Sequence, residues 1–94
     1  MAHALIHAEF RDYDEWKPVF EELASLRGRY GSQGTRIFRA DDHPNEAVIL
    51  TEFRDEQEAR RMFQSDEFRE ATQRAGVTTP PKIEFLDEVD SLVS

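Results

Sequence analysis

The sequence contains no cysteine, which excludes a disulfide framework, a thiolate nucleophile and a zinc site built on cysteine. It also has no apolar run near the roughly 20 residues that span a bilayer. Its first ten residues lack the basic and apolar segments of a signal peptide. We therefore expect a cytoplasmic protein with no membrane partner.

Basic residues are in the minority, with 12 Lys and Arg against 20 Asp and Glu and a net charge of −8. Nucleic-acid binding needs a concentrated basic surface, so this balance argues against a nucleic-acid partner. The basic residues also alternate with acids, as in Arg54-Asp55-Glu56. Such a pattern is typical of a solvated surface that carries many salt bridges.

What the chain does have is the composition of one small globular domain. It has 94 residues, of which 38% are hydrophobic and 34% are charged. Seven Phe, two Tyr and one Trp are plentiful for this length. These aromatic residues must fill much of the core or line a pocket.

Alternation of apolar and polar residues predicts strands over residues 3–10, 35–40 and 82–89. A further strand over residues 47–53 begins with four apolar residues in a row, which is typical of a central strand covered on both faces. In the first strand, Ala4, Ile6, Ala8 and Phe10 share one face, and His3, Leu5, His7 and Glu9 share the other. In the second strand, Ile37 lies opposite Arg36 and Phe38. The breaker-rich residues 41–45 join the second and third strands as a hairpin.

Asp12 and Glu15 form a pattern like a capping box and predict the start of the first helix. Pro18 falls inside the helical pattern and leaves two alternatives: the helix begins near Trp16, or it begins at Asp12 and bends at Pro18. Three glycines then end it: Gly28, Gly31 and Gly34.

The second helical region has the same kind of start, with Asp55 and Glu58 as its cap pair. Ser65 restarts the helix, and Gly76 ends it before Pro80-Pro81. The element order βαββαβ in so short a chain predicts an α+β ferredoxin-like sandwich. In that fold both helical regions cover one face of a four-stranded antiparallel sheet.

The opposite face of this sheet would be too apolar for water and too polar for an ordinary core. It would carry Leu5, His7 and either Val48 or Ile49. A second copy of the same sheet is the simplest cover. We therefore expect a homodimer.

The run from Ile49 to Ala71 resembles the dimeric α/β-barrel superfamily, which includes small antibiotic-biosynthesis monooxygenases and polyketide cyclases. Glu52-Phe53, Ala59, Ser65 and Phe68 carry the resemblance. It implies a dimeric barrel with a pocket between sheet and helices in each subunit. Many oxygenase-like and cyclase-like relatives have a histidine just before that Ser. Here Met62 and Phe63 stand there, so no role of that histidine transfers to this chain.

His7 is the candidate catalytic residue because it lies mid-strand at the sheet face. The alternative is a hydrogen-bonded histidine in the dimer contact. The three histidines are too scattered to indicate a metal site. A haem would have only His7 as an axial ligand.

The candidate substrate-binding residues are aromatic or basic: Tyr13, Trp16, Phe20, Arg36 and Phe38. We expect the aromatic ones to face Ala4 and Ala8 across a pocket, or else to be ordinary core packing. The Arg36 guanidinium could face an anionic or quinone-like oxygen, or pair with a carboxylate.

Two functions follow from these features. The first is a protein of undetermined activity that binds an apolar or aromatic metabolite as its small-molecule partner. The second is a cofactor-independent monooxygenase or a polyketide-type cyclase. No Gly-x-Gly-x-x-Gly and no phosphate loop is present, so we expect no nucleotide cofactor and assign none.

Overall fold

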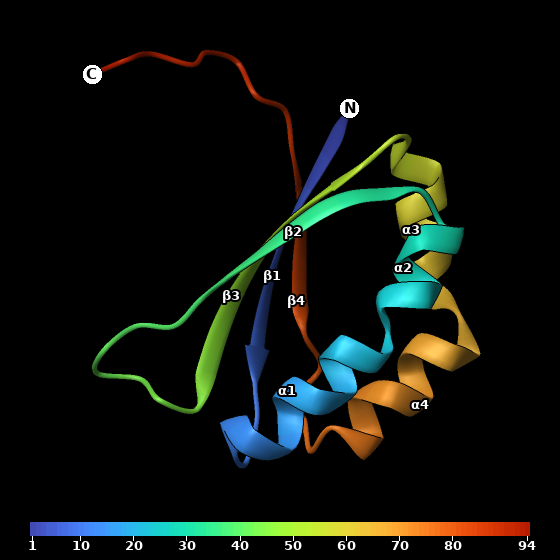
Figure 1. Ribbon diagram of the computed structural model, residues 1–94, viewed down its shortest axis with the longest axis vertical. Coiled ribbons are helices and arrows are strands. Elements are labelled where there is room, and N and C mark those ends of the chain that lie inside the picture. The colour runs from blue at the N-terminus through green and yellow to red at the C-terminus, as the bar shows by residue number, and fades with distance from the viewer.

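The computed structural model describes residues 1–94, with four strands and two pairs of helices (Figure 1). The elements in chain order are β1 (Ala2–Glu9), α1 (Tyr13–Glu22), α2 (Ala24–Arg29), β2 (Ser32–Phe38), β3 (Glu46–Phe53), α3 (Glu56–Gln64), α4 (Asp66–Arg74) and β4 (Lys82–Leu86). None of the helices has the length and apolar character needed to cross a membrane.

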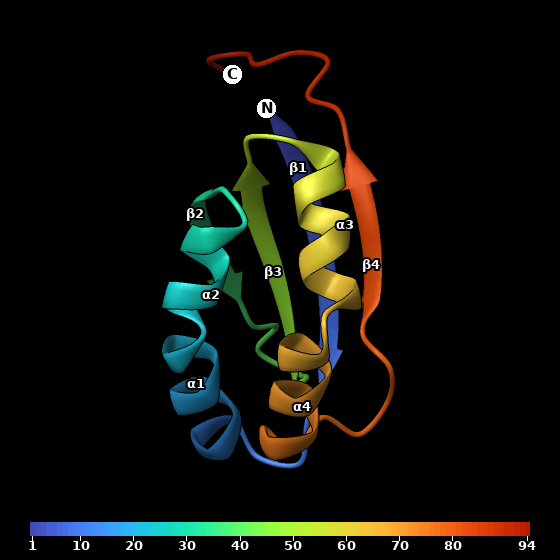
Figure 2. The same ribbon diagram turned by 90° about the vertical axis from the view of Figure 1, so that its right-hand side faces the viewer.

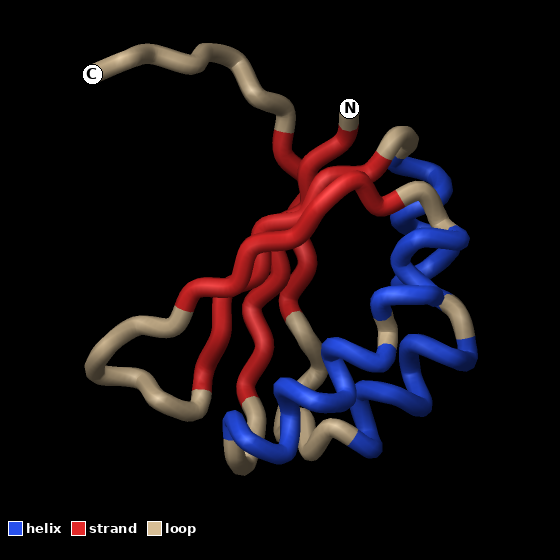
Figure 3. The backbone as a smooth tube through the Cα atoms, in the orientation of Figure 1, coloured by secondary structure: helices blue, strands red, loops and turns tan.

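The four strands form one sheet in the order β2-β3-β1-β4, and all neighbouring strands are antiparallel. All four helices lie on the same face of this sheet (Figures 2 and 3). The predicted α+β ferredoxin-like fold is therefore confirmed. The other face of the sheet, which we call the outer face, has no helix over it.

The core lies between the sheet and the helices because β1 and β3 alternate strictly. Their inward residues are nearly all buried: Ala4, Ile6 and Ala8 of β1, and Ala47, Ile49, Thr51 and Phe53 of β3. Four of these seven are small, since three are alanines and one is threonine. Small residues on the sheet leave room for large aromatic side chains from the helices.

Both predicted N-caps are present, but neither capping box forms. The Asp12 carboxylate accepts a hydrogen bond from the backbone N–H of Asp14, and Asp55 accepts one from Gln57. The expected cap partners are bound elsewhere, because each is four residues from an arginine. Glu15 pairs with Arg11 at 2.9 Å, and Glu58 pairs with Arg54 at 3.2 Å.

The first helix begins at the Asp12 cap, as in the second alternative, and runs past Pro18, so its break comes later than that alternative placed it. It falls at Leu23, between α1 and α2. Gly28 lies inside α2 and does not end it. Gly31 follows the helix with a φ of +85°, a conformation that glycine adopts without strain.

The ends of two strands also differ from the prediction. β2 begins at Ser32 and its pairing register shifts between Ser32 and Gly34. β4 ends at Leu86 instead of residue 89. Residues 87–94 extend away from the body of the molecule, and their apolar side chains Val89, Leu92 and Val93 are exposed (Figure 1).

A repeated contact joins the first half of the chain, from β1 to β2, to the second half, from β3 to β4. We call this contact the Arg–Glu clasp. The sequence Glu-Phe-Arg-Asp occurs at the end of β1 and again at the end of β3. In the first clasp, the backbone N–H of Arg54 donates to the Gly31 carbonyl at 3.0 Å. In the second clasp, Arg11 donates to Gly76 at the same distance. Each arginine therefore binds the glycine that closes the helices of the other half.

Both clasp glycines also lie directly against the Arg–Glu pair. A Cβ atom on Gly31 would stand 2.5 Å from Glu58 Oε2 and 2.7 Å from Arg54 Nε. A Cβ on Gly76 would meet the side chains of Glu15 and Arg11. Both glycines have positive φ. The clasp therefore needs glycine for its backbone conformation and for its space.

We expect Gly31→Ala and Gly76→Ala each to lower the free energy of unfolding by about 1–3 kcal/mol, because alanine is strained at positive φ and collides with the ion pair. Gly28→Ala is the matched control, since Gly28 is helical and a Cβ atom added to it would have no neighbour within 4 Å. It should raise stability by about 0.5–1 kcal/mol. Urea unfolding measures all three, and equal effects would contradict the clasp.

Candidate ligand site between sheet and helices

Two apolar cavities lie between the sheet and the helices, with volumes of about 50 and 40 Å³. Ile6 and Ile49 of the sheet line both cavities, as do Phe20, Leu23 and Phe68 of the helices. The two are therefore neighbouring parts of one interior, divided by side chains. Their walls are almost entirely apolar.

The aromatic residues predicted on the first helix form a stack at one end of this interior. The Trp16 ring stacks on Phe10 and on Phe20, with ring centroids 5.0 Å apart in each case. Trp16 is buried, and it lines the larger cavity together with Phe20. Tyr13 extends the stack at 5.9 Å from Trp16 but does not line either cavity. The structure thus brings together three of the predicted aromatic residues.

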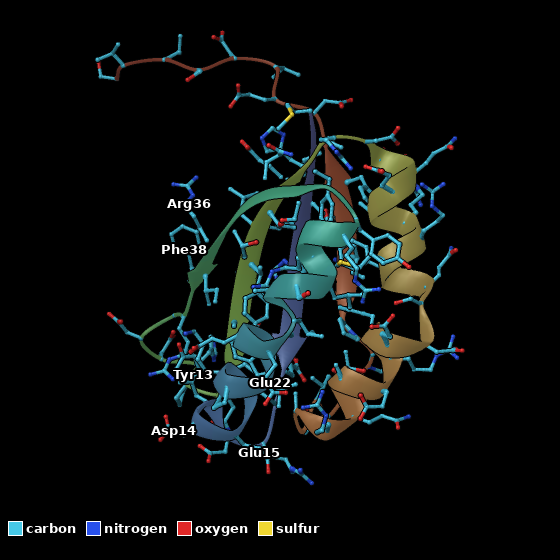
Figure 4. The ribbon with its side chains drawn as sticks, turned by 45° about the vertical axis from the view of Figure 1, so that its right-hand side comes forward. Tyr13, Asp14, Glu15, Glu22, Arg36 and Phe38 are labelled. Atoms are coloured by element: carbon cyan, nitrogen blue, oxygen red, sulfur yellow. The ribbon has the colours of Figure 1, made fainter.

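Arg36 and Phe38 do not join them, which corrects the predicted pocket. Both side chains project from β2 on the outer face, away from the helices (Figure 4). The cause is strand alternation, because Ile37 takes the inward position between them and packs against the core. Arg36 instead lies over the Phe38 ring, with its Cζ 5.7 Å from the ring centroid.

His7 also lies on the outer face, opposite Val48 of β3 and Lys82 of β4. Its Nδ1 is 3.7 Å from Glu46 Oε1. It lines neither cavity, so it is not placed to act on a molecule bound in the interior.

The other histidines are also outside the interior. His3 pairs with Glu52 at 3.0 Å on the outer face. His43 is exposed in the loop between β2 and β3. No group of three His, Asp or Glu side chains is arranged to hold a metal ion.

Three polar residues that the sequence analysis did not identify also border the smaller cavity: Arg27, Thr35 and Thr51. They turn only apolar atoms toward it. Arg27 Nη1 donates to the Phe20 carbonyl at 2.7 Å, and its Cζ lies 4.2 Å above the Phe20 ring. Burial lowers the pKa of the Arg27 guanidinium, which remains charged at neutral pH.

Two exposed ion pairs join the first helix pair to α4: Arg29–Glu67 at 2.7 Å and Glu22–Arg74. Phe20, Leu23 and Phe68 line both cavities and are only partly buried. A cavity that holds benzene needs about 150 Å³, so a ring can enter only when these side chains move. Exposed ion pairs hold the helices together only weakly.

The model of the antibiotic biosynthesis monooxygenase family matches residues 2–74. The chain belongs to this family. The match covers both helix pairs and three of the four strands, so it includes most of the residues that enclose the interior. No curated protein matches the chain.

Solved structures agree with this assignment at the level of the fold. SnoaB, a cofactor-independent oxygenase from Streptomyces nogalater, is similar over 99% of this chain and 97% of its own, with 18% identity and a TM-score of 0.79. An antibiotic biosynthesis monooxygenase is similar over 96% and 100%, with 15% identity and a TM-score of 0.73. A conserved protein from Methanosarcina mazei Go1 is similar over 90% and 89%, with 14% identity and a TM-score of 0.71.

We expect Phe68→Ala to join the two cavities, because Phe68 lines both of them. The variant should bind benzene and lose about 2–3 kcal/mol of stability, less than a fully buried Phe would cost. Leu92→Ala, on the exposed C-terminal segment, is the control. Thermal unfolding with and without benzene tests this, and benzene should stabilise Phe68→Ala alone. Equal stabilisation of Leu92→Ala would contradict the assignment of the interior.

Proposed function

We propose that this antibiotic biosynthesis monooxygenase family member is a homodimer that binds an apolar or aromatic small molecule between its sheet and helices. The observation that carries the proposal is the composition of the interior. Aromatic and aliphatic side chains line it, and Arg27 is its one ionisable group. Such a site excludes water and favours a ring system.

The second candidate function is a cofactor-independent oxygenase, with a cyclase of polyketide type as its variant. Family membership and the similarity to SnoaB favour the oxygenase. A dry apolar interior would hold a reactive conformer of the substrate and keep water from an enolate. General acid–base chemistry would have no His, Asp or Glu in the cavity walls, which favours binding as the first proposal.

The homodimer rests on the outer face of the sheet. Leu5 lies opposite Leu50 at its centre, and Val48 and Phe38 are paired beside them. Three polar pairs surround this apolar centre: His3–Glu52, His7–Glu46 and Lys82–Glu84. An apolar centre with a polar rim is the usual composition of a protein interface. We infer that His7 belongs to the contact between subunits.

Trp16 is the single tryptophan of the chain, so its fluorescence reports on the interior directly. We expect neutral monocyclic and bicyclic aromatic compounds to change its emission in a saturable way. Ala71→Val should weaken this binding at least about tenfold, because Ala71 is buried in the cavity wall and two added methyl groups occupy the space. Ala24→Val, exposed at the start of α2, is the matched control.

The outcomes separate the two candidate functions. Saturable binding without oxygen uptake in the presence of polycyclic phenols supports the binding protein. Oxygen uptake that Ala71→Val abolishes supports the oxygenase. The binding proposal fails when no compound changes either the Trp16 emission or the melting temperature.

For the dimer, light scattering behind a sizing column should give twice the chain mass of 11.0 kDa. Leu50→Glu should convert the protein to monomers, because it places a charge at the apolar centre of the outer face. Ala24→Glu adds the same charge on the helix side and should leave the dimer intact. A wild-type protein that elutes as a monomer would refute the proposed contact.

A further inference from the structure

Residues 87–94, which we call the arm, leave the sheet after β4 and run away from the helices (Figure 1). We propose that each arm of the homodimer crosses to the partner subunit and packs on the outward side chains of β2 there. A carboxylate of the arm pairs with Arg36 of the partner subunit, and Leu92 lies against its Phe38. This exchange rests on the proposed homodimer and adds a contact that neither sheet supplies.

The arm carries apolar side chains that its own chain leaves uncovered. Val89, Leu92 and Val93 each have an exposed fraction of 76% or more. Single exposed apolar residues are ordinary on a protein surface, but such a concentration marks an interaction site. The outer face has exposed apolar residues of the same kind, Phe38 and Leu86. The uncovered apolar surface therefore lies on the arm and on the face where the second copy binds.

The arm is also strongly acidic. It contains Asp87, Glu88 and Asp90 and no basic residue. None of these three carboxylates forms an ion pair within the chain. In a chain of net charge −8, they gain most from a cation that has no carboxylate of its own.

The outer face offers one such cation. Its other basic side chains, His3, His7 and Lys82, each lie beside a glutamate. Arg36 has no carboxylate partner, and its Cζ lies 5.7 Å from the ring centroid of Phe38. The unpaired base and the exposed ring thus form one patch on β2, with the charge opposite to that of the arm.

The spacing within the arm matches the spacing within this patch. Successive side chains of an extended segment alternate between its two sides, so residues two apart share a side. Asp90 and Leu92 are therefore an acid and an apolar residue on one side of the arm. Arg36 and Phe38 are a base and an apolar residue at the same separation on β2. An extended arm alongside β2 brings both pairs into register.

The arm is long enough for this contact. Eight extended residues span up to about 26 Å. Four strands side by side are only about 14 Å across, with neighbouring strands about 4.8 Å apart. An arm that starts at either edge of the partner's sheet can therefore reach β2. Exchange of an identical segment between two copies is also a low-cost way to strengthen a dimer.

An arm that folds back on its own β2 is the competing explanation. Glu88 and Arg36 of one chain line the same hollow of about 310 Å³ at the rim of the outer face. Folding back would make the same pairs within one chain, and the stability of the dimer would not depend on the arm. Linkage between two chains and the dissociation constant of the dimer distinguish the two arrangements.

Sedimentation equilibrium of a chain that stops after Leu86 tests the exchange. We expect its dimer dissociation constant to rise at least about tenfold. Arg36→Glu should have a similar effect in the full chain but change the shortened chain less than about threefold, because the arm that Arg36 binds is gone. Arg61→Glu is the matched control, since Arg61 is exposed and unpaired on α3. It should leave the dimer unchanged.

Disulfide linkage shows which chain the arm contacts, because the protein has no cysteine of its own. Phe38→Cys and Leu92→Cys proteins are mixed, allowed to exchange subunits and oxidised. The three possible covalent dimers differ in mass. We expect mass spectrometry to find the mixed dimer, which joins position 38 of one chain to position 92 of another. Absence of the mixed dimer overturns the exchange.

The outcomes for the exchange and for the homodimer are separate. A dimer that the shortened chain forms as tightly as the full chain overturns the exchange and leaves the homodimer in place. The same holds when Arg36→Glu weakens both chains equally, because Arg36 then contacts the partner's sheet. A wild-type protein that is monomeric overturns both. Circular dichroism checks that the shortened chain is folded.

Discussion

The two Arg–Glu clasps are the constraint on which the rest of the structure depends. Each joins the end of a strand in one half to the glycine that closes the helices of the other half. The helix pairs are thus fixed to the sheet at opposite ends of the molecule. Between these ends, bulky side chains separate two small cavities, and exposed ion pairs join the first helix pair to α4.

The sheet divides the functional roles between its two faces. Its inner face carries small residues such as Ala8 and Ala47, which make room for the aromatic stack on α1. Its outer face carries an apolar centre with His7 and other paired polar side chains around it. In our account the inner face binds the ligand and the outer face binds the second copy. Strand alternation alone produces this division.

Much of the fold could be predicted from the sequence, because alternation and N-cap residues are local signals. The hydrogen-bond partners of Glu15 and Glu58 could not be predicted in this way. Arg11 and Arg54, each four residues before its glutamate, bind these carboxylates in place of the helix N-termini. The predicted site mixed the two faces: alternation about Ile37 already separated Phe38 from the aromatic residues on α1. Arg27 was missed because a surface cation and a cavity cation look the same in sequence. Only the packing of Phe20 beneath it shows which it is.

A crystal structure of the protein with naphthalene bound tests the central claim most directly, because it shows on which face of the sheet an aromatic ring lies. The account predicts the ring against Trp16 and Phe20, with Phe68 displaced. The ring bound on the outer face beside His7 or Arg36, with the interior unchanged, would contradict it.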